Sequence, residues 1–193
     1  MEENGPYVVT GKHNYILRGT TDAIARELGD ALVAPIVRFV PEGRIDPPPG
    51  HMKFPGTISL SEDTFRRLLT DICASFRPHG FRDIVLVGDS GNQKGMKAVA
   101  AELHESVDKW LASQGIKEVD QGLHDSFAVS TTLAAVDPKL IRAKQRQAAK
   151  TFSINGVELA PLEKTAEWGK KIINFRAEAT AKAIRRAVSE PRP

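Results

Sequence analysis

The sequence predicts an α/β fold in which a mostly parallel sheet packs against helices. Two short apolar runs rich in β-branched residues, Leu32–Val40 and Asp83–Asp89, have the composition of buried strands. Helical spacing recurs after each run, and the connections are long enough for crossovers between parallel strands. Because reactive groups in such sheets gather at the carboxyl ends of the strands, Asp89 lies where chemistry is expected.

Residues 20–56 are expected to form one helix, one strand and a long loop. Thr20, Thr21 and Asp22 are typical helix caps, and they precede a short helix over Ala23–Leu28 that Gly29 ends. The strand over Leu32–Val40 follows. The next segment, 41–56, carries five of the twelve prolines, which predicts a rigid loop without regular structure.

Two helices and a strand come next. Ser59 and Glu62 have the spacing of a capping box before a helix whose apolar residues recur up to Phe76. The strand over Asp83–Asp89 then leads into an amphipathic helix from Met96 to Leu111. The remaining expected elements are a short strand within Gly115–Leu123, a helix over Phe127–Val136 and a last helix that Pro161 opens.

Length and composition indicate one globular domain over residues 1–193. Hydrophobic residues make up 41% of the chain and charged residues 26%, which suffices for a core. The apolar stretches are far shorter than the roughly 20 residues that span a bilayer, and no leader opens the chain. We therefore expect no membrane association and a cytoplasmic location for the chain as given, whereas export would need a longer N-terminus.

The positive charge of the chain is concentrated near its C-terminal end. The formal net charge is +3, and the run Lys139–Lys150 contains five cations and no acid. A nucleic-acid interface would interleave such cations with aromatic residues, and this run has none. The pattern favours a solvated helix face over a nucleic-acid partner.

Four segments of the sequence carry motifs, taken here in order. Glu2–His13 reads E-E-N-G-P-Y-V-V-T-G-K-H, and His51–Leu60 reads H-M-K-F-P-G-T-I-S-L. Gly80–Asn92 and His124–Pro138 follow as the third and fourth. Together they resemble the signatures of the creatininase family, the creatinine amidohydrolase-like metal hydrolases. The first segment aligns without a gap to E-Q-H-G-P-H-L-P-L-G-T-D, the second matches H-x-x-F-P-G-T-I-S-L and is the most specific, and the fourth match is loose.

The resemblance implies a single-domain, three-layer sandwich around the mostly parallel sheet. In the family the first signature follows a buried strand, but only Met1 precedes Glu2 here, so we expect either that the sequence as given is truncated or that the native protein lacks this strand. A sheet edge left open in this way needs cover. We therefore expect a homo-oligomer, as is common among family members.

The resemblance also implies a metal site. In the family a Glu, an Asp and a His bind one divalent metal, and the matching positions here hold Glu2, His13 and Asp89, so that the Asp and the His have exchanged places. The retained set of two carboxylates and one imidazole suits Zn or Mn with positions open to water. We therefore expect one divalent metal ion, Zn or Mn, bound by these three side chains.

The family's second metal site is not expected in this chain. Asn4 replaces its first His, and Phe127 and Val129 occupy the two acid positions of the fourth motif. An imidazole at His13 has one lone pair and cannot bridge two cations as a carboxylate does. One metal ion is therefore the limit.

The function implied by the resemblance is hydrolysis of a C–N bond in a small cyclic or linear amide by a metal-activated water. His124 matches a family histidine and is our candidate acid/base, since the usual histidine pKa of about 6.5 suits proton transfer near neutrality. Asp89 would also take part in catalysis, and Asn92 would contact the small-molecule substrate. His51 would either contact the substrate or serve as a structural cap of the proline-rich loop. The alternative is a non-catalytic metal- or ligand-binding relative, which the loss of the second site favours.

Overall fold

The computed structural model describes residues 1–88, 106–118, 126–150 and 152–190. In these ranges the regular elements are α1 (Lys12–Leu28), α2 (Glu62–Phe76), α4 (Phe127–Val136), α5 (Ala143–Ala148), α6 (Leu162–Ser189), β1 (Ser153–Ile154) and β2 (Val157–Glu158). Short 3-10 turns add η1 (Gly50–Lys53), η2 (Arg77–His79) and η3 (Pro138–Ile141). Residues 106–113 are also helical.

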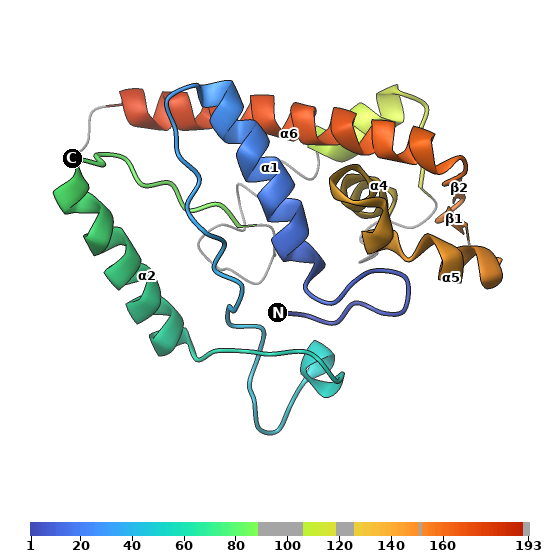
Figure 1. Ribbon diagram of the computed structural model, residues 1–193, viewed down its shortest axis with the longest axis horizontal. Coiled ribbons are helices and arrows are strands. Elements are labelled where there is room, and N and C mark those ends of the chain that lie inside the picture. Colours follow the sequence, from blue (N-terminus) through green and yellow to red (C-terminus); the bar gives the residue numbers. More distant parts are fainter. Residues whose placement is uncertain (89–105, 119–125, 151, 191–193) are drawn as a thin grey trace.

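The predicted parallel sheet and the three-layer sandwich are wrong. The sheet found in the described ranges is a two-stranded antiparallel hairpin of β1 and β2, joined at Asn155 and Gly156. Both turn residues have positive φ, 51° and 82°, which is the geometry of a tight hairpin turn. Helices instead make up most of the described chain (Figure 1).

The two predicted strands are extended, and neither belongs to a sheet within the described residues. The run Leu32–Val40 makes a backbone-to-backbone hydrogen bond at its end, where Val40 O accepts from the Leu60 N–H at 3.4 Å. The side chains of both runs are largely exposed, with Leu32 82% and Leu86 54% accessible. Composition sets the extended backbone locally, whereas a sheet requires a second strand in register. Of the third predicted strand, Gly115 is a turn residue, residues 116–118 are irregular, and residues 119–123 lie outside the described residues.

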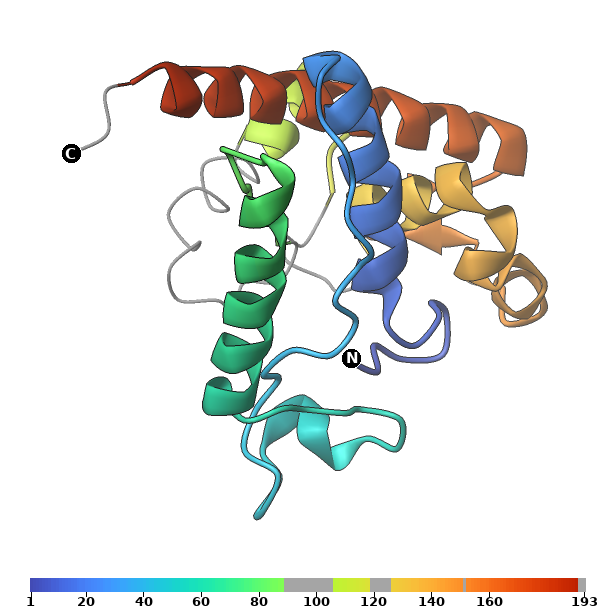
Figure 2. The ribbon, with the colours of Figure 1, turned by 60° about the vertical axis from the view of Figure 1, so that its left-hand side comes forward.

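Three helices form the packed part of the molecule. α6 runs along one side, and α1 and α4 pack against it (Figures 1 and 2). The contact between α4 and α6 is so close that a Cβ on Gly169 would stand 1.9 Å from the backbone oxygen of Thr131. Leu133, Ile141 and Ile172 are among the fully buried apolar side chains of this region.

Several predicted helices are confirmed, although some boundaries differ. α4 has the predicted bounds, and Pro161 immediately precedes α6. The predicted helix over Ala23–Leu28 is the last part of α1, which begins at Lys12 after Gly11, so the expected caps at Thr20–Asp22 are wrong. The apolar positions of the earlier turns, such as the buried Ile16, extend the helix toward the N-terminus.

The cap of α2 lies two residues later than predicted. Ser61 accepts a hydrogen bond from the Thr64 backbone N–H at 3.1 Å. The hydroxyl of Ser59 instead accepts from the backbone N–H of Glu42 at 3.0 Å and so ties two loops together. Segment 41–56 has the predicted irregular backbone, apart from η1.

The cationic run 139–150 is not one solvated helix face. Arg146 is 1% exposed, and its guanidinium donates to Ile141 O and to Ser130 Oγ, both at 3.0 Å. The same group stacks over the ring of Tyr7, 5.3 Å from its centroid. Arg146 therefore packs inside the fold.

In the ranges described, no helix has the length and apolarity needed to span a bilayer.

Candidate functional site

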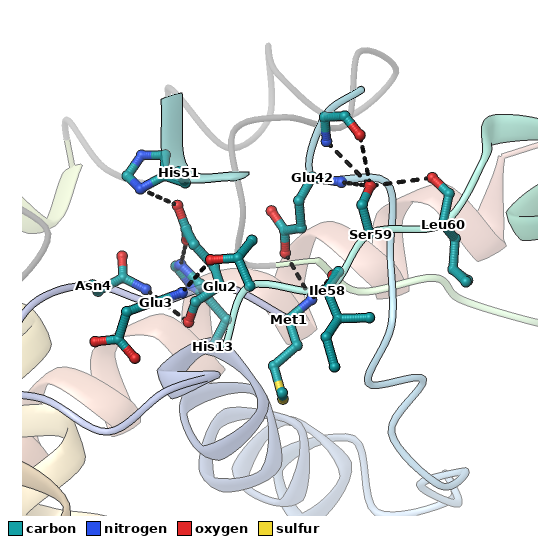
Figure 3. A network of polar contacts seen from close by, with 12 residues as sticks. Met1, Glu2, Glu3, Asn4, His13, Glu42, His51, Ile58, Ser59 and Leu60 are labelled. Atoms are coloured by element: carbon teal, nitrogen blue, oxygen red, sulfur yellow. Dashed lines mark hydrogen bonds and ion pairs between the residues drawn. The ribbon is translucent and has the colours of Figure 1, made fainter. Parts of the chain in front are cut away.

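The segment before α1 holds the first predicted site residue in place. The backbone N–H of Gly11 donates to Glu2 O at 2.8 Å, which closes residues 2–11 into a loop. The backbone of Met1 pairs with Ile58, whose N–H donates to Met1 O at 2.8 Å (Figure 3). These contacts bring the N-terminal segment, the start of α1 and the segment after the proline-rich loop to one point.

Glu2 lies where these three segments meet. Its side chain is 5% exposed, and its Oε2 is 3.2 Å from Nε2 of His13, in the first turn of α1. Its Oε1 is 3.2 Å from Nδ1 of His51, in η1 (Figure 3). Because an ionised carboxylate only accepts hydrogen bonds, Nε2 of His13 donates the hydrogen bond that it shares with Glu2.

The neighbours of Glu2 hold the local backbone. Thr10 donates its hydroxyl proton to the carboxylate of Glu3, whose own backbone N–H donates to Thr57 Oγ1 at 3.1 Å. The amide nitrogen of Asn4 donates to Glu2 O at 3.2 Å, while its side-chain oxygen is buried without a hydrogen-bond partner within the described chain. Asn4, at the position of a family histidine, thus supports the Glu2 backbone.

A cleft of about 1180 Å³ opens beside these residues. Glu2 and His13 contribute to its wall at one end, and α2 together with the extended segments 31–39 and 81–88 supplies much of the remainder. Its apolar lining includes Leu17, Val33, Phe65 and Leu86. His51 is not part of this lining. Glu2 therefore borders a space large enough for a small organic molecule.

The donors in this place are compatible with part of a metal site. A carboxylate oxygen and an imidazole nitrogen 3.2 Å apart can become two ligands of one divalent ion with a small movement, and the carboxylate is also in contact with His51. Within the described ranges, however, no group of three His, Cys, Asp or Glu side chains is arranged to hold a metal ion. A complete site would need a donor from outside those ranges, and Asp89 is the predicted one.

The structure therefore brings together Glu2 and His13, which were predicted as ligands, and adds His51, which was predicted to contact substrate. Asp89, Asn92 and His124 lie outside the described residues. The contact between His51 and Glu2 was not expected. The two residues are 49 positions apart, and no local pattern encodes such a pairing; the only available signal was that both belong to signatures of one family.

Comparisons with known proteins bear on the identity of the chain. The sequence profile of the creatininase family, described as creatinine amidohydrolase, matches residues 1–184. Comparisons with curated proteins and with solved structures gave no match. Because the family profile covers nearly the whole sequence, a metal-dependent, amidohydrolase-type function follows at the level of the family. The chain belongs to the creatininase family.

Proposed function

We propose that the protein is a hydrolase that cleaves a C–N bond of a small cyclic or linear amide and that binds one divalent metal ion, Zn or Mn. The observation that carries the proposal is the buried carboxylate of Glu2, 3.2 Å from His13 and open to an apolar cleft. A buried acid and an imidazole at the end of a cleft are typical of a catalytic or metal-binding centre.

Each proposed residue has a separate task. Glu2 and His13 would hold the ion from the wall of the cleft, with Asp89 as the third ligand. His124 would move the proton between the attacking water and the leaving nitrogen, and Asn92 would contact the amide. The apolar walls near Val33 and Leu86 would exclude water from the substrate.

A divalent ion at this place would polarise the carbonyl oxygen of the amide and make a water molecule more acidic. The described residues provide the surroundings that such chemistry requires. The side chain of Glu2 is 5% exposed, so its charge acts with little screening by solvent. Both of its oxygens contact other side chains, which fixes the carboxylate before any ligand arrives.

The alternative is a relative that binds a metal or ligand without catalysis. One observation favours it: Asn4, at the position of a histidine ligand of the second family site, hydrogen-bonds the Glu2 backbone. A protein that binds one ion tightly but hydrolyses no amide would fit this alternative.

The test combines metal affinity with turnover. Protein reconstituted with Zn²⁺ or Mn²⁺ should hydrolyse at least one compound in a panel of cyclic and linear amides. Glu2→Gln, His13→Gln and Asp89→Ala should each weaken metal affinity by more than about 100-fold, because each removes a ligand from a three-ligand site. Competition with a chromophoric chelator measures the affinity.

Matched variants control for general damage. His79 and Glu163 are exposed and lie in η2 and α6, so His79→Gln and Glu163→Gln should leave both metal affinity and turnover unchanged. Unaltered metal affinity in Glu2→Gln and His13→Gln would refute the proposed site. Tight metal binding in the wild type without turnover on any amide would favour the non-catalytic alternative.

A further inference from the structure

The proline-rich loop, 41–56, reaches the candidate site through one side chain. His51 lies in η1, in the middle of an otherwise irregular and largely exposed segment. Its Nδ1 is 3.2 Å from Oε1 of Glu2, which is the oxygen that does not face His13 (Figure 3). One carboxylate therefore joins a helix and a loop that are far apart in the sequence.

The position of His51 argues against direct contact with a molecule in the cleft. Glu2 and His13 line the cleft, whereas His51 does not. The side chain of His51 is 38% exposed, whereas that of Glu2 is 5% exposed, so His51 is the more accessible partner of the contact.

We propose that His51 is a positioning residue that holds Oε1 of Glu2 and thereby fixes Oε2 toward His13. The same contact fastens the loop 41–56 to the N-terminal segment. This role replaces the substrate contact expected from the sequence. The fastening of the loop does not depend on a metal, whereas the consequence for metal affinity rests on the proposed function.

The physical basis is the rotation of a carboxylate about its last bond. A Glu side chain without an outer partner turns freely about its broad terminal torsion, and ordering it on binding costs free energy. The imidazole of His51, 3.2 Å from Oε1, restricts that rotation beforehand. Outer partners of this kind typically change metal affinity by 10- to 100-fold in other metalloproteins.

The first experiment uses the metal-free protein and limited trypsin digestion. Arg44 and Lys53 are exposed cleavage sites on either side of His51. His51→Ala should raise the initial rate of cleavage at these two sites by about tenfold, because the 3.2 Å contact with the buried carboxylate of Glu2 is lost. His51→Asn places an amide N–H near the position of Nδ1 and should return the rate close to that of the wild type.

Two further variants show whether the effect runs through Glu2. The double variant His51→Ala with Glu2→Ala should be cleaved no faster than either single variant, because both changes remove the same contact. His79→Ala, at an exposed histidine in η2, should be cleaved like the wild type. Equal cleavage rates in wild type, His51→Ala and His51→Asn would overturn the proposal whatever the metal result.

The second experiment measures Zn²⁺ and Mn²⁺ affinity by competition with a chelator. His51→Ala should weaken the affinity by about 10- to 100-fold, and His51→Asn should recover most of the loss. The wild type could bind neither metal while His51→Ala is still cleaved faster by trypsin in the loop 41–56. In that case the proposed function is refuted and the positioning role stands. If metal affinity depends on Glu2 but not on His51, the positioning role is refuted and the metal site stands.

Discussion

The helices α1, α4 and α6 and the segment from residue 29 to residue 88 differ in how local structure relates to burial. The helices share fully buried side chains such as Ile16, Leu133 and Ile172. Between residues 29 and 88, in contrast, no apolar residue is buried, although this stretch contains the well-formed helix α2. Helix formation and burial are therefore separate outcomes in this chain.

The reason is that capping and periodicity act locally, whereas burial needs a partner surface. α2 has a Ser cap, acidic residues in its first turn and apolar residues at helical spacing. Leu68 on this helix is nevertheless 38% exposed. In contrast, α4 is short and apolar nearly all round, and it is covered by α6 and α1.

The largest expected difference between the two regions is in the cost of removing a leucine side chain. Leu133→Ala should lower the free energy of unfolding by about 3 kcal/mol, because Leu133 is 0% exposed and the change leaves a cavity. Leu68→Ala should cost less than about 1 kcal/mol, because Leu68 is already partly in water. Urea denaturation followed by circular dichroism measures both. Equal costs would mean that α2 is covered in solution.

A smaller effect should follow from adding a methyl group where α4 and α6 touch. Gly169→Ala should lower the free energy of unfolding by about 2 kcal/mol, because the new Cβ would overlap the backbone of Thr131. Helix propensity alone would stabilise this variant by roughly 1 kcal/mol. Lys170→Ala, on the exposed side of the same helix, controls for changes in α6. A more stable Gly169→Ala protein would contradict the close contact.

The smallest effect concerns the two helix caps. Ser126 accepts from the Val129 N–H at 3.4 Å at the start of α4, as Ser61 does for α2. Ser126→Ala should lower the free energy of global unfolding by about 1 kcal/mol. Ser61→Ala should instead speed hydrogen exchange within α2 and leave global unfolding nearly unchanged, because α2 buries no residue. If Ser61→Ala lowered the free energy of global unfolding as much as Ser126→Ala does, α2 and α4 would not differ in their contribution to global stability.

Local signals in the sequence predicted most helices and failed for the sheet. The bounds of α4 and the role of Pro161 before α6 follow from short-range preferences and are confirmed. The apolar runs 32–40 and 83–88 have strand composition, but their pairing depends on residues far along the chain. The hairpin of β1 and β2 was missed, although its Asn155-Gly156 turn is a strong short-range signal.

For the site, motif alignment was more informative than any local pattern. It singled out Glu2, His13 and His51, which the structure places together, although their roles as metal ligands or substrate contacts stay predictions. Alignment could not show that His51 faces Glu2, because the direction of a side chain depends on how the loop folds back. The homo-oligomer and the absence of a nucleic-acid partner likewise stay predictions.

The packing of α1 against α6 has a consequence for synthesis of the chain on the ribosome. Roughly 130 residues separate the end of α1 from the start of α6, and translation at about 5 to 20 residues per second needs roughly 7 to 26 seconds to cover them. Ile16 packs with Leu133 of α4, whereas Ile24 packs with Ala177 of α6. The nascent chain therefore exposes the apolar surface around Ile24 until α6 emerges.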